Sequence, residues 1–188
     1  MNTELARFLV QLTVAIALFL PTASRADQTD ERLSELFAIL QSSHTPVELQ
    51  EAEIAIWAIW FESGLEDIDR LMEVAGKAVQ SGDLHQAEAL YSRVIEMAPR
   101  FSEGWNRRAT VRYYQRDYEG SLDDIEITLR LEPRHFGATW GLGMILGFQH
   151  DFSGAISAFE HLLELKPNAR DARPRIELLK QELARSAI

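Results

Sequence analysis

Histidine is the residue type in this chain best suited to binding a metal ion or moving a proton. The five histidines are His44, His85, His135, His150 and His161. No two are three or four residues apart, so no single helix presents a paired histidine site. His135 and His150 flank one predicted helix and could approach neighbouring turns, but we expect both to be histidines of surface loops. The spacing therefore indicates no histidine metal site.

Acidic pairs are the second candidates, because carboxylates bind calcium. Asp67 lies near Asp69, and Asp123 is followed by Asp124. A calcium loop spaces several oxygen ligands around a glycine, and neither pair belongs to such a pattern. Asp67 and Asp69 are predicted at a helix start, where negative charge is favourable in any case. We expect no metal at either pair.

Glycines at positions 137, 141, 143 and 147 superficially resemble a phosphate-binding loop. Apolar residues alternate with them, including Trp140 and Leu142. This pattern predicts a helix whose glycines allow close packing. There is also no Gly-x-Ser-x-Gly motif, which a serine hydrolase of the α/β class would need.

Composition excludes further classes of function. The 188 residues contain no cysteine, which removes disulfides, thiol catalysis and zinc–thiolate sites. Acidic residues number 29 against 19 basic ones, for a net charge of −10, and such a surface repels nucleic acid. We therefore expect no enzyme, no cofactor, no metal and no nucleic-acid partner.

The first 26 residues read as an export signal. Residues 8–20 form an apolar run, shorter than the roughly 20 residues that a membrane-spanning helix needs. Arg7 precedes the run, Pro21 breaks it, and Ser24-Arg25-Ala26 offers small residues to signal peptidase. We expect cleavage after Ala26 and a periplasmic location. The alternative is an uncleaved leader that anchors the protein in the inner membrane.

The remaining chain repeats with a period of 34 residues. Pro99, Pro133 and Pro167 each end a similar apolar segment of sequence. Other columns with this spacing hold an aspartate, a large apolar residue or a small residue, namely Asp83, Asp117, Asp151; Tyr91, Ile125, Phe159; Ala87, Ser121, Ala155; and Ala75, Ala109, Gly143. A fixed period of this kind predicts stacked helical hairpins. Each aspartate is expected to cap a second helix, and each proline follows its end.

These columns resemble the tetratricopeptide repeat, with its small-residue, Ala-x3-Phe and terminal proline positions. The resemblance implies an all-α solenoid of three hairpins, over residues 66–99, 100–133 and 134–167. Residues 168–188 are expected to hold a C-terminal capping helix, with Ile176, Leu179 and Leu183 facing inward.

The residues before the first repeat are expected to form a degenerate hairpin over residues 27–65. Leu33, Leu36, Phe37 and Leu40 have helical spacing, and Thr45 to Glu48 reads as a capping box that opens a second helix. Residues 54–61 of that helix are apolar on nearly every face. At the end of an array, only the short first helix and the first repeat could cover it. Either they suffice, which we favour, or part of it contacts another molecule.

Three short sequence segments indicate a resemblance to a narrower group of proteins. Ile56 to Trp60, Glu103 to Thr110 and Leu131 to Gly137 look like those of an uncharacterised group of exported tetratricopeptide proteins from alphaproteobacteria. That resemblance implies a periplasmic protein and no particular activity.

What remains is recognition by shape, since the first helices of stacked hairpins line a concave face. The repeat resemblance implies that the partner contacts side chains offset from the packing columns: Asp69, Met72 and Gly76 in the first repeat; Asn106, Thr110 and Tyr113 in the second; Gly137, Trp140, Met144 and Phe148 in the third. The Lys/Asn array that clamps a terminal carboxylate is missing, so an apolar or helical peptide is the better candidate. The alternative is that Trp140 and Phe148 only fill space between hairpins.

Two arginines depart from the repeat pattern. Arg108 and Arg112 occupy positions that are normally half buried. A buried guanidinium needs a partner, and a familiar variant of the repeat implies an ion pair between Arg108 and Asp124. We expect Arg112 to reach solvent or an acid on a neighbouring helix. The alternative is that Arg107, Arg108 and Arg112 form a basic patch for an acidic partner.

The sequence thus favours a non-enzymatic periplasmic scaffold that binds a protein or peptide partner in the concave groove. The second hypothesis is a membrane-associated structural subunit, held by an uncleaved leader and the Trp57–Phe61 face. An enzyme ranks third.

Overall fold

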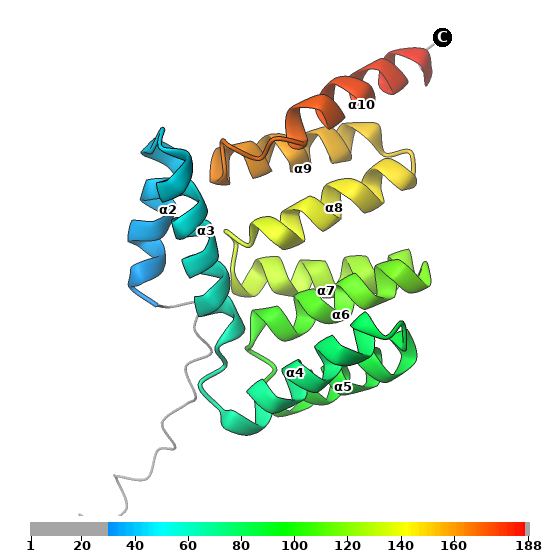
Figure 1. The fold of residues 1–188 in the computed structure, drawn as a ribbon. Helices are drawn as coiled ribbons and strands as arrows, with labels where there is room; N and C mark the ends of the chain where they lie inside the picture. Colours follow the sequence, from blue (N-terminus) through cyan, green and yellow to red (C-terminus); the bar gives the residue numbers. More distant parts are fainter. Residues whose placement is uncertain (1–29, 187–188) are drawn as a thin grey trace, which may run out of the picture.

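The computed structural model describes residues 30–186, so the predicted leader lies outside the described range. Within that range the chain forms nine helices and no strand (Figure 1). They are α2 (Arg32–Ser42), α3 (Pro46–Phe61), α4 (Glu66–Gln80), α5 (Leu84–Met97), α6 (Ser102–Gln115), α7 (Tyr118–Leu131), α8 (Phe136–Phe148), α9 (Phe152–Leu165) and α10 (Ala172–Ser186). None of these helices is long and apolar enough to cross a membrane.

Helices α4 to α9 form three stacked hairpins, followed by α10 against α9 (Figure 1). Each second helix begins at the predicted aspartate, whose carboxylate accepts a bond from the backbone N–H three residues later. These N–H···O distances are 3.0 Å for Asp83, 3.0 Å for Asp117 and 2.9 Å for Asp151. The predicted all-α solenoid is confirmed.

Small residues set the distance between helices within each hairpin. Ala75, Ala109 and Gly143 are buried, and a Cβ added at Gly143 would lie 2.8 Å from the Phe159 ring. A Cβ at Gly137 would lie 2.7 Å from the Trp57 ring. The glycines of α8 thus lie on a helix and serve close packing, as their spacing predicts.

The N-terminal hairpin does not stack as a further layer below α4. Helices α2 and α3 pack on each other and run along the edge of the array, where α3 contacts α6 and α2 contacts α9 (Figure 1). The Lys166 ammonium pairs with Glu53 at 2.5 Å, and Phe136 lies 5.2 Å from Trp57 between ring centroids. The expectation that only the first helix and the first repeat could cover α3 is therefore wrong.

Helix α3 is buried on one side only. Ile56, Ile59 and Trp60 are buried, whereas Ile54 is 59% and Phe61 39% exposed. Repeats two and three thus cover one side of this apolar segment, and its other side faces solvent.

Two details of the helix ends differ from expectation. Thr45 makes no side-chain capping bond; instead Ser43 donates to the Glu48 carboxylate and accepts from the Thr45 N–H. In α10, Ile176 is buried and Leu179 half-buried, but Leu183 is 41% exposed. Leu183 therefore does not face inward as predicted.

Candidate functional site

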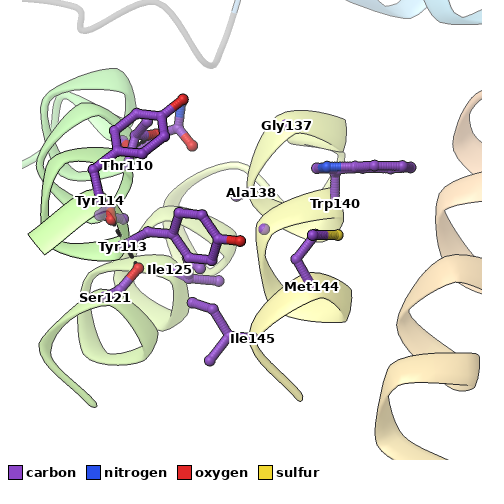
Figure 2. Close-up of a pocket in the computed structure, with 13 residues that line it drawn as sticks. Thr110, Tyr113, Tyr114, Ser121, Ile125, Gly137, Ala138, Trp140, Met144 and Ile145 are labelled. Carbon is purple, nitrogen blue, oxygen red and sulfur yellow. Dashed lines mark hydrogen bonds between the residues drawn. The ribbon is translucent and has the colours of Figure 1, made fainter. Parts of the chain in front are cut away.

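A pocket of about 180 Å³ lies between α6 and α8, on the inner face of the second and third repeats (Figure 2). Six of the ten residues predicted to contact a partner line it, among them Asn106, Thr110, Tyr113, Trp140 and Met144. Gly137 lines it as well. We call this space the central pocket.

The wall formed by α6 is polar. The Asn106 amide donates to Glu103 at 2.9 Å, and the Thr110 hydroxyl donates to the Asn106 carbonyl at 3.0 Å. Burial, together with nearby Tyr118, raises the pKa of Tyr113, although Arg175 acts in the opposite direction. The Tyr113 phenol is thus a neutral group at neutral pH, and Figure 2 shows its hydroxyl pointing across the pocket toward α8.

The wall formed by α8 is apolar. Trp140 and Met144 project from one face of the helix, one turn apart, on the pocket side. Trp140 is half-buried: its ring packs edge-on to Phe159 at 5.1 Å, and the Arg175 guanidinium lies 5.5 Å from its centre. Trp140 therefore both packs against its own hairpin and offers surface to the pocket.

The remaining predicted contact residues lie elsewhere. Phe148 does not line the central pocket; it is 55% exposed and stacks on Tyr118 at 5.8 Å, near α10. Asp69, Met72 and Gly76 line a separate hollow between α4 and α6. Asp69 accepts bonds from the Ser63 N–H and hydroxyl, so its carboxylate fixes the loop before α4.

The lining of the central pocket contains no charged side chain. Among residues 30–186, no group of three histidine, aspartate or glutamate residues is placed to hold a metal ion. The pocket can therefore offer apolar contact on one side and neutral hydrogen-bonding groups on the other.

Arg108 and Asp124 lie together in the second repeat. The guanidinium donates to both carboxylate oxygens, at 2.9 and 2.7 Å, and also to the Ser92 hydroxyl at 3.0 Å. Arg112 donates to Glu88 on α5 at 3.0 Å and to Asp124 at 3.1 Å. Asp124 thus joins two arginines inside the stack of α5, α6 and α7.

Arg107 is paired as well, with its Nε 2.5 Å from Glu103. Each of the three arginines in this region is therefore held by a carboxylate. Together they do not form an open basic patch.

His135 differs most from expectation, because it is fully buried. Its Nδ1 accepts from the Ala138 N–H at 3.1 Å, which places the ring proton on Nε2, and Nε2 donates to Glu103 at 2.9 Å. The ring stacks on Trp60, with centroids 4.3 Å apart. His150, by contrast, is exposed in a turn as predicted.

Glu103 is the centre of this network and is fully buried. Burial acts to raise the pKa of Glu103, but the hydrogen bond from His135 and the charge of Arg107 outweigh it and hold that pKa below 4.5. The carboxylate thus remains ionised inside the protein.

One signal in the sequence points to this network. The three sequence segments that carry the narrower resemblance contain Trp60, Glu103 and His135, which the fold brings into contact. Their mutual packing could not be read from the period, because it depends on α3 lying across the repeats.

Comparison with known proteins agrees with this architecture. Residues 106–169 match the tetratricopeptide repeat family model. A TPR repeat-containing protein of Rhizobium etli is 33% identical over 154 residues, covering 82% of this chain and 76% of that protein. Tetratricopeptide repeat protein 36 of Mus musculus is 29% identical over 50% of this chain and 56% of its own length.

Solved structures show the same fold. The Sgt2 TPR domain from Aspergillus fumigatus aligns with a TM-score of 0.61 at 21% identity, covering 65% of this chain and 83% of that domain. The first TPR of Spaghetti, bound to an HSP90 peptide, aligns with a TM-score of 0.60 at 20% identity, covering 62% of this chain and 93% of that chain. With the repeat columns, the stacked hairpins and the Rhizobium relative in agreement, the chain belongs to the tetratricopeptide repeat family.

Proposed function

We propose that this protein is a non-enzymatic scaffold that binds a segment of a partner protein in the central pocket. The observation that carries the proposal is the lining itself: an uncharged space with tryptophan and methionine on one wall and neutral polar groups on the other. Such a surface suits one large apolar side chain of a peptide, with backbone hydrogen bonds along the polar wall.

The chemistry of the pocket argues against a peptide recognised by its terminal carboxylate. One structural neighbour was solved bound to an HSP90 peptide, and the TPR2B domain of yeast Sti1 was solved as a pHsp70 complex. A carboxylate needs cationic donors, and the lining of the central pocket has none. An apolar internal segment is therefore the better match.

Substitution of Trp140 tests this proposal. Trp140→Ala should weaken binding of a peptide selected on the purified protein from a displayed random library, by at least about tenfold if tryptophan is a binding hot spot. Isothermal titration measures the affinity, and thermal melting measures the stability of the same variant. Trp105→Ala is the matched control, because Trp105 is also half-buried but lies outside the pocket.

The two outcomes are distinguishable. If Trp140 only fills space, its replacement should cost about 3–5 kcal/mol of stability and leave peptide affinity unchanged in the folded fraction. That result would reject the central pocket as the binding site.

We further propose that the protein acts in the periplasm after cleavage behind Ala26. The support is the short apolar run at residues 8–20, with small residues at positions 24 and 26. Intact mass should give Asp27 as the first residue, and fractionation should release the protein with soluble periplasmic contents. Retention of residues 1–26 in carbonate-washed membranes would instead favour the membrane-associated structural subunit.

A further inference from the structure

The C-terminal end of the inner face has an apolar surface that the central pocket does not include. A hollow of about 220 Å³ lies between α8 and α10, with Gly147, Phe148 and Phe152 on one side and Leu178 and Leu179 on the other. Phe148 is 55% and Leu178 54% exposed. We call this space the cap hollow.

Helix α10 presents one stripe of side chains to the cap hollow. Arg175, Leu178 and Glu182 all line it, spaced three and four residues apart, and therefore share one face of the helix. Leu178 lies at the centre of this α10 stripe, with a cation before it and an anion after it.

The charge order along α10 is self-complementary. When two copies of the helix lie antiparallel and cross between Leu178 and Leu179, each Arg175 faces Glu182 of the second copy. A two-fold contact needs this reversal of sign about its centre, because the same surface serves both partners.

The charges on the stripe are available for such a contact. Among residues 30–186, the Arg175 guanidinium has no carboxylate within 4.0 Å; it lies over the face of Trp140, and its charge acts on Tyr113. Glu182 accepts from Arg185 through Oε1 on its own helix, and both residues are at the surface. Most other arginines of the repeats are already paired with carboxylates.

We infer that the protein forms a two-fold dimer through the α10 stripe, with the second copy of α10 lying antiparallel against the cap hollow. Leu178 of each copy then covers the apolar wall formed by Phe148 and Phe152 of the other. This contact would close the C-terminal end of the inner face and leave the central pocket open. It does not depend on what the central pocket binds.

Sedimentation velocity of the purified protein over a concentration series tests the dimer. The wild-type protein should associate in the micromolar range, and Leu178→Glu should weaken association at least about tenfold, because it buries two carboxylates at the centre. Val74→Glu is the control: Val74 is 42% exposed but lies on α4, in the first repeat. A wild-type protein that stays monomeric up to about 1 mM would overturn the inference.

A charge exchange tests the antiparallel arrangement itself. Arg175→Glu and Glu182→Arg, each alone, should weaken self-association, because like charges then meet at two symmetric contacts. Mixing the two variants should restore a dimer of one copy each, since every contact again pairs opposite charges. Circular dichroism confirms that both variants are folded. If mixing gives no more dimer than either variant alone, the α10 stripe is not the interface.

Discussion

At the scale of single residues, the most consequential group is the buried carboxylate of Glu103. It accepts from His135 and Asn106 at 2.9 Å each and pairs with Arg107 on the side toward α3. Arg107 in turn lies over the Phe61 ring, 4.3 Å from its centre. One carboxylate therefore links the second repeat, the third repeat and the N-terminal hairpin.

Its lowered pKa gives a prediction of pH dependence. Because the folded-state pKa of Glu103 lies below 4.5, its ionisation stabilises the fold above about pH 4.5, and this contribution is lost as the pH falls through the folded-state pKa. Denaturant unfolding at a series of pH values should show stability falling on acidification. Glu103→Gln should be less stable at neutral pH, by about 3 kcal/mol, because Arg107 and His135 lose an anionic partner.

The control compares how steeply the free energy of unfolding changes with pH in each variant. Glu103→Gln should lose less stability between pH 6 and pH 3 than the wild-type protein does, since the titrating group is gone. A matched change at the exposed Glu51, Glu51→Gln, should keep the steeper pH dependence of the wild-type protein. Equal slopes for Glu103→Gln and wild type would show that other carboxylates cause the acid sensitivity.

At the scale of elements, the capping helix α10 shields the third repeat. Ala172 and Ile176 are buried in the same core cluster as Phe159 and Leu162 of α9. Repeat arrays need such a cap, because each layer is stabilised by its neighbours.

Deletion of residues 171–188 should therefore lower the melting temperature and increase binding of a hydrophobic dye. The comparison variant is Leu178→Glu, which leaves the inward face of α10 in place and should melt close to the wild-type temperature. If the truncated protein melts at the wild-type temperature without binding more dye, α10 does not act as a cap.

Local signals in the sequence sufficed to predict the three repeats and the residues at which their helices begin and end. The 34-residue period places Asp83, Asp117 and Asp151 at helix starts, and the resemblance to a variant of the repeat implied the pair of Arg108 and Asp124. The burial of His135 could not be predicted in this way. Its cover is Trp60, from a helix 75 residues earlier whose position across the repeats leaves no trace in the period.

At the scale of the whole molecule, the N-terminal hairpin changes how the array holds together. In a simple solenoid each repeat contacts only its neighbours. Here one core cluster contains Phe37 and Trp60 of the hairpin together with Phe136, Phe159 and Ile176. The hairpin, the third repeat and the cap thus share a core, and Glu103 extends their connection to the second repeat.

The first repeat lies outside that shared core. Helices α4 and α5 form their own cluster, which includes Phe101, directly before α6, and Val111 within α6. Their main contacts with the rest of the chain are therefore on one side only, with α6. Fewer contacts give a lower free energy for local opening.

Hydrogen exchange should resolve this difference. Amides in α4 and α5 should exchange at a lower opening free energy than those in α8 and α9, because the first repeat can open without disturbing the core around Trp60. Trp60→Ala should then speed exchange in α8 and α9 more than in α4 and α5, since it removes the ring that covers His135 and Phe136. Uniform acceleration across all hairpins would instead mean that the array opens as one unit, with the first repeat as firmly held as the third.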